Sequence, residues 1–259
     1  CGQKQKEVNS ENPSHSAITS VDSFQQGGSQ VVFRVPTPIE FFRFYQDAGG
    51  IYNGQLILQT TNLQKYLSRR EKAVAFGLYA SDLAFSSVFG NNQQTISLFE
   101  ASKTIADDLG LTEGYGEKLM TQFRNNLDNV DSLYHLTTES YWKIFAMLED
   151  QDQTEILSYI TVAGWVESLY LAINSSGDNL NHSVKQCIAD QQYVIENLTS
   201  YLTAVHELAV DTDSVFKMVI ELNQLYMGLY ENTDDTVITE RQFAEIKDKV
   251  NKYRSILVK

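Results

Sequence analysis

Apolar residues recur every three or four positions over most of the chain, which is the spacing that places them on one face of an α-helix. Alternation of apolar and polar residues, which would mark strands, is nearly absent. Glycines and capping residues separate the periodic stretches. The pattern predicts helices at 38–48, 62–89, 92–109, 115–125, 129–149, 153–174, 182–209, 213–231 and 239–257. We therefore predict an all-α fold, a bundle or array of about eight or nine helices, in one domain over residues 31–259.

Two of these stretches are apolar on nearly every side, which is typical of helices buried in a core. They cover residues 74–89 and 156–173, and each contains a single charged residue, Asp82 or Glu167. The first stretch also has a flank of small residues, which lets a neighbouring backbone come close. That flank consists of Gly77, Ala80, Ser81, Ala84 and Ser87. We expect these two helices to form the centre of the fold.

The two central stretches share a glycine spacing. Gly77 and Gly164 are each followed by another glycine thirteen positions later. An amphipathic stretch follows the buried one in both cases. This suggests a tandem repeat of helical hairpins, with halves at 37–125 and 129–259. Residue identity between the halves is slight, so the spacing is the main sign of the repeat.

Asp82 and Glu167 are the candidate ligand-binding residues. A charge buried alone is costly, so each carboxyl must be paired, hydrogen-bonded or protonated. In a functional interpretation, a polar pocket between the central helices holds a ligand or a general acid–base pair. In a structural interpretation, which is the commoner case, each acid bonds a Tyr, Trp or Ser or meets a Lys or Arg from another helix. An enzyme would need both carboxyl groups in one solvent-reachable cavity, within about 10 Å of each other.

Asp131, His135 and Glu139 are spaced as metal ligands on one helical face would be. The apolar stripe of that helix lies elsewhere and Glu139 can pair with Lys143, so we expect a solvated face instead. No HExxH, GxSxG, Walker or dinucleotide-binding glycine motif occurs. The sequence therefore predicts no metal site and no cofactor, and it assigns no catalytic residue.

The formal net charge of −13 argues against nucleic acid as a partner, because binding to phosphates needs clustered positive charge. Residues 1–30 are polar and hold little to bury, which predicts a flexible linker. Cys1, with no signal sequence before it, is typical of a mature bacterial lipoprotein, and we predict lipid attachment there. Cys187 falls on a core-facing position, which indicates a free thiol that packs as a small hydrophobe.

Three segments carry a family resemblance: VPTPIEFFRFYQDAG, GLYASDLAFSSVFGNNQQTISLFEASKTIADDLGL and VAGWVESLYLA. They resemble a family of uncharacterised helical lipoproteins from Bacteroidota-type bacteria, over roughly residues 35–210. The resemblance implies a helical fold anchored in the cell envelope, and it carries over no catalytic residues. We expect the periplasmic side of the outer membrane, because no acidic cluster of the kind associated with surface export follows Cys1.

The expected function is therefore a non-enzymatic binding or scaffolding role in a membrane-tethered envelope lipoprotein. The partner would be another envelope protein or a small-molecule ligand. The alternative is a hydrolase or metal-dependent enzyme that uses Asp82 and Glu167.

Overall fold

The computed structural model describes residues 37–112, 116–175, 177, 180–206, 213–233 and 237–258. All of them belong to one unit of the chain, Phe33–Lys259. The predicted linker and the lipid attachment residue Cys1 lie outside the described residues. Within these ranges the regular structure is helical and no strand occurs, so the predicted all-α class is confirmed.

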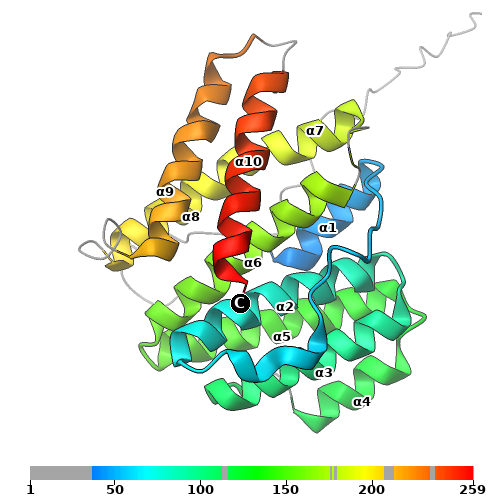
Figure 1. Ribbon diagram of the computed structural model, residues 1–259. Coiled ribbons are helices and arrows are strands. Elements are labelled where there is room, and N and C mark those ends of the chain that lie inside the picture. Colours follow the sequence, from blue (N-terminus) through cyan, green and yellow to red (C-terminus); the bar gives the residue numbers. More distant parts are fainter. Residues whose placement is uncertain are drawn as a thin grey trace, which may run out of the picture. The chain divides into compact units, whose positions relative to one another are not determined.

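The helices follow one another with short connections (Figure 1). Their bounds are α1 Pro38–Asp47, the 3-10 helix η1 Thr60–Lys65, α2 Arg69–Val88, α3 Asn92–Leu109, α4 Glu117–Asn125, α5 Val130–Asp150, α6 Thr154–Ser175, α7 His182–Ala189, α8 Gln191–His206, α9 Ser214–Met227, the 3-10 helix η3 Gly228–Glu231 and α10 Glu240–Leu257. Capping boxes form at the starts of α1 and α10, from Thr37 with Glu40 and from Thr239 with Gln242, residue pairs whose spacing in the sequence predicts them.

The predicted helix 62–89 is wrong at its beginning. The side chain of Ser68 accepts a hydrogen bond from the Glu71 backbone, and the Glu71 carboxylate bonds back to the Ser68 N–H. This capping box starts α2 at Arg69 and leaves η1 as a separate turn. The residues before α2 are therefore free to follow a different course along the core.

The predicted helix 182–209 is divided at Asp190 into α7 and α8. In a continuous helix the carbonyl of Ile188 would accept from the backbone N–H four residues later. Here it accepts a hydrogen bond from the hydroxyl of Tyr226 at 3.2 Å. The side chain from α9 thus replaces the helical hydrogen bond that the break removes from this carbonyl.

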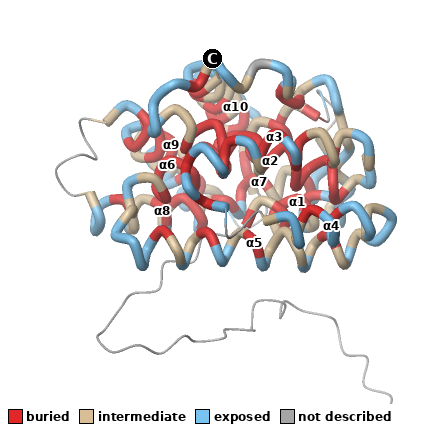
Figure 2. Tube along the Cα trace, turned by 90° about the horizontal axis from the view of Figure 1, so that it is seen from below, coloured by how far each residue is buried: buried red, intermediate tan, exposed pale blue. Residues whose placement is uncertain are grey.

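The core is built around α2 and α6, whose residues are buried over most of their length (Figure 2). A Cβ on Gly77 would lie only 2.2 Å from the backbone oxygen of Ile160, so the two backbones touch here. One turn further on, Ser81 and Ser168 share a hydrogen bond of 2.8 Å. Residues 87 positions apart therefore face each other at two successive turns, and the two helices run in the same direction (Figure 1). The small flank predicted on α2 is the surface that permits this approach.

The remaining helices surround this pair, and α10 packs on α6 and α9. The most apolar stretch of α6 is long enough to cross a membrane, but 94% of it is buried within the fold. A core helix has the same composition, and no other helix in the described ranges meets that test.

Candidate functional site

Asp82 of α2 and Glu167 of α6 come together at the centre of the fold. Both residues are 0% exposed, and their carboxyl groups lie close enough that each acts on the pKa of the other. They do not occupy equivalent positions of the paired helices, because Asp82 lies one residue after Ser81 and Glu167 lies one residue before Ser168. The two acids therefore form one polar cluster that breaks the local symmetry of the helix pair.

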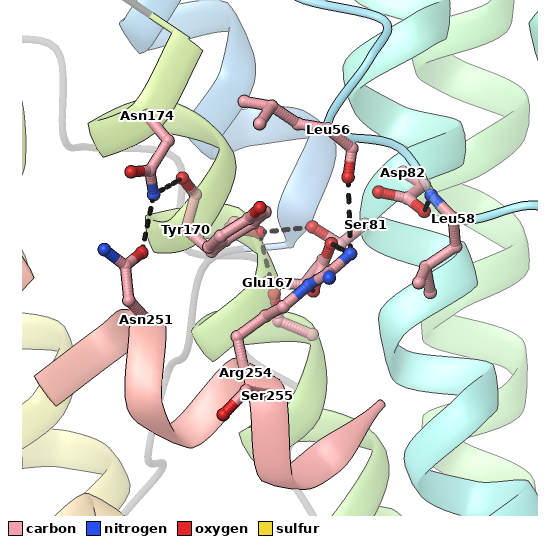
Figure 3. Close-up of polar contacts among 12 residues, drawn as sticks. Leu56, Leu58, Ser81, Asp82, Glu167, Tyr170, Asn174, Asn251, Arg254 and Ser255 are labelled. Atoms are coloured by element: carbon pink, nitrogen blue, oxygen red, sulfur yellow. Dashed lines mark hydrogen bonds and ion pairs between the residues drawn. The ribbon is translucent and has the colours of Figure 1, made fainter. Parts of the chain in front are cut away.

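Arg254, near the end of α10, holds Glu167 with two hydrogen bonds, from Nε to Oε2 at 3.1 Å and from Nη2 to Oε1 at 3.3 Å (Figure 3). Nη2 also donates to the backbone oxygen of Leu56 at 3.3 Å. The guanidinium lies over the ring of Tyr170, 4.4 Å from its centroid, which adds a cation–π contact. Two parallel bonds to a carboxylate are the strong form of an ion pair. This contact attaches α10 and the loop around Leu56 to α6.

The geometry assigns one proton to the carboxyl pair. Oδ2 of Asp82 accepts a hydrogen bond from the Leu58 N–H at 2.9 Å, while Oδ1 has no N–H donor in the described part of the chain. Burial, with the adjacent Glu167 carboxylate, raises the pKa of Asp82 well above its usual range. Burial also raises the pKa of Glu167, but Arg254 and the bond from Asp82 act against that rise. Asp82 is therefore the protonated partner and Glu167 carries the negative charge.

Two tyrosines, Tyr52 and Tyr79, lie near enough to Asp82 for its carboxyl group to act on them. Tyr52 bonds Ser86 and Asn91, and Tyr79 donates to the backbone oxygen of Gln59 at 2.7 Å. Burial raises the pKa of both phenols. Both hydroxyls are therefore neutral at physiological pH, and the charges of the cluster are those of Glu167 and Arg254.

Replacing Asp82 by asparagine is expected to keep the fold and to remove a pH-dependent loss of stability. The new amide accepts from Leu58 and donates to Glu167, as the protonated carboxyl does. Because the folded-state pKa of Asp82 lies above its unfolded value, its contribution to stability is present at low pH and is lost as pH rises toward the folded pKa. Unfolding free energies from about pH 4 to pH 8 should increasingly favour Asp82→Asn, by at most about 1.4 kcal/mol per pH unit.

Glu139→Gln provides a control of opposite sign. The bond from Lys143 lowers the pKa of Glu139, so the stability that this pair contributes is lost as pH falls. The unfolding free energy of the wild-type protein should therefore increase relative to that of Glu139→Gln as pH rises through the acid range. If Asp82→Asn behaved like Glu139→Gln, Asp82 would be ionised in the fold and the shared proton would be wrong.

An open hollow of about 280 Å³ lies beside this cluster, and Arg254 is part of its wall. Its lining is mostly polar and consists of Gln55, Leu56, Ile57, Leu58, Gln59, Lys65, Tyr170 and Arg254. The loop between α1 and η1 supplies five of these residues, and η1, α6 and α10 supply one each. Neither Asp82 nor Glu167 lines the hollow, because both are sealed behind the backbone of the loop and the Arg254 guanidinium.

The other sequence candidates do not gather at a site. Asp131 is bonded to Arg43 at 2.8 Å, and Glu139 is bonded to Lys143 at 2.6 Å. Both contacts lie on the exposed face of α5, which is the solvated face predicted. In the described part of the chain no group of three or more His, Cys, Asp or Glu side chains is placed to hold a metal ion. Cys187 is a free thiol, and burial raises its pKa to about 12.

The two cations at the hollow, Arg254 and Lys65, do not stand out in the sequence. Arg254 lies in a strongly charged stretch, KDKVNKYRSILVK, where nothing distinguishes it from its neighbours. The one available signal was chemical: a buried acid requires a counter-ion, and α10 carries a basic residue in its last turn.

No family model, curated protein or solved structure matches this chain. The resemblance to a lipoprotein family therefore stays a prediction. The residues and their geometry are what bear on function.

Proposed function

We propose that this protein is a membrane-tethered envelope protein that binds a small molecule without transforming it. The observation that carries the proposal is that the buried carboxyl pair and the solvent-open hollow are separate. The carboxyl pair is sealed at 0% exposure, while a polar hollow with two cationic side chains opens to solvent next to it. A hollow of about 280 Å³ lies just below the usual range of small-molecule sites, which favours a small ligand over a protein segment.

The alternative function, a hydrolase that uses Asp82 and Glu167, has weaker support. A general acid or base must come within hydrogen-bond distance of a substrate or of one bridging water. Leu58 and Arg254, which bond Asp82 and Glu167, line the hollow, whereas neither acid does. Asp82 thus holds the loop and Glu167 holds α10, so the two acids position the walls of the hollow.

The binding function predicts that the wild-type protein retains a small molecule from an extract of its own cells after equilibrium dialysis, detected by mass spectrometry. Gln55→Trp, which places a large side chain on the exposed lining of the hollow, should retain less of it. Gln93→Trp, at an exposed position of α3, is the matched control and should retain as much of the molecule as the wild type. Retention of nothing by the wild type, or turnover of the retained compound, would overturn the proposal.

The tether is a separate prediction, since Cys1 lies outside the described residues. Expressed with a lipoprotein signal sequence, the wild-type chain should incorporate radiolabelled palmitate and sediment with membranes. A Cys1→Ser variant should remain in the soluble fraction, because two acyl chains are needed for stable anchoring. Cys187→Ser is the control for labelling at the other cysteine. A Cys1→Ser chain that still partitions with membranes would disprove lipid attachment at that residue.

A further inference from the structure

The charges around the hollow do not balance. Arg254 and Lys65 each carry a positive charge, Glu167 carries one negative charge, and protonated Asp82 carries none. Among the described residues Lys65 has no carboxylate partner, and its amine lies over the ring of Tyr66 at 5.2 Å from the centroid. The cluster thus has one net positive charge, in a chain whose formal charge is −13.

The two cations also act on each other. Burial and the nearby Arg254 guanidinium lower the pKa of Lys65. Two like charges at one partly buried site are unfavourable unless an anion lies between them. Eight Lys or Arg side chains other than Lys65 and Arg254 have an acidic partner at 3.1 Å or less in the described ranges, including those in exposed positions. Lys65 has no such partner and lines the hollow together with Arg254, so its charge is available to a ligand there.

Arg254 has donors left for a ligand. Its Nε and Nη2 atoms are used by Glu167 and by the backbone of Leu56. Its Nη1 atom has no partner in the described part of the chain. The guanidinium is held rigidly by these bonds and by the Tyr170 ring, so little side-chain freedom is lost when Nη1 donates to a ligand.

We propose that the hollow binds one carboxylate group of a small polar molecule, held between the amine of Lys65 and Nη1 of Arg254. This inference rests on the proposed binding function and names its ligand class. One carboxylate neutralises the single net charge of the cluster, whereas a phosphate dianion would exceed it. The amide side chains of Gln55 and Gln59 at the rim suit hydroxyl or amide groups on the rest of the ligand.

The test is a titration of the full chain with acetate, lactate and gluconate in a carboxylate-free buffer, followed by calorimetry. Glucose serves as the neutral counterpart of gluconate, and inorganic phosphate serves as an anion that is not a carboxylate. Gluconate or lactate should bind and glucose should not. Lys65→Met should weaken carboxylate binding about tenfold or more, as expected for the loss of a charge-assisted hydrogen bond.

Lys72→Met is the matched control, because Lys72 lies on α2, bonds Asp108 at 2.6 Å and does not line the hollow. Its carboxylate affinity should equal that of the wild type. NMR of labelled lysines gives a second readout, since a bound carboxylate should raise the pKa of Lys65. Arg254 is left unchanged because it holds the fold together.

Unchanged affinity in Lys65→Met, or equal binding of gluconate and glucose, would overturn the inference. If no carboxylate binds while the wild-type protein still retains a neutral molecule from extract, the ligand class is wrong and the binding function stands. If neither experiment shows a ligand, both proposals fail.

Discussion

Gly77→Ala is expected to destabilise the fold by about 3 kcal/mol, although alanine is the better helix former. The added methyl group would lie 2.2 Å from the backbone oxygen of Ile160 and 2.9 Å from the backbone nitrogen of Gly164. Neither atom belongs to a side chain that can turn away, so α2 and α6 must separate. The packing along their whole contact is then lost. Urea unfolding, followed by circular dichroism, measures the change in the free energy of unfolding.

Gly164→Ala is the matched control on the facing helix. Its new methyl group would lie 3.3 Å from the backbone oxygen of Gly77, so a small shift accommodates it. The helix propensity of alanine offsets part of that cost. We therefore expect Gly164→Ala to lie much closer to the wild type than Gly77→Ala. Equal stability of the two variants would mean that the helices do not meet at Gly77 as described.

The central position of α2 and α6 could be predicted from the sequence because their apolar composition is compatible only with burial. A helix that is apolar all round must be surrounded, and a flank of small residues such as Gly77 and Ser81 must face a close neighbour. The helix caps at Thr37 and Thr239 could also be predicted from the sequence, since each depends on two residues three positions apart. Local chemistry decided these features, and the structure agrees with each of them.

The contacts of the charged residues could not be predicted in this way. Lys217 precedes Glu221 by four residues, which is the spacing of a helical ion pair. In the structure the Glu221 carboxylate instead bonds Lys249 and Tyr253 of α10, and these bonds lower its pKa to about 2. The choice between two possible partners depends on how α9 and α10 pack, and the spacing within α9 carries no information on that.

For the same reason the sequence predicts the two acids of the site but not the groups that bond them. The sequence marked Asp82 and Glu167 as costly buried charges and as a candidate pair in one pocket, but it did not show what neutralises them. Their solution is shared: one proton and one arginine serve both carboxyl groups. The arginine comes from the last helix, 87 residues after Glu167, and the bond from Leu58 comes from a loop without a recognisable motif.

Glu167→Ala is expected to have the largest effect at the site, about 3–5 kcal/mol, because it leaves a charge buried without its partner. The Arg254 side chain is only 17% exposed, so water replaces the lost carboxylate poorly. Thermal and urea unfolding should both show the loss. Glu139→Ala, which removes an exposed partner of Lys143, is the control and should change stability little.

Asp82 should limit the loss of stability caused by Glu167→Ala, and a double variant tests this. Without Glu167 the pKa of Asp82 falls, because its like-charged neighbour is gone while Arg254 remains close. Asp82 then loses its proton and becomes a substitute counter-ion, which the asparagine of Asp82→Asn cannot do. The combined Asp82→Asn and Glu167→Ala variant should therefore lose more stability than the sum of the two single changes. Simple additivity would show that the two carboxyl groups do not share one proton and one arginine. The coupling, if found, makes the pair a single electrostatic unit that holds Arg254 at the wall of the hollow.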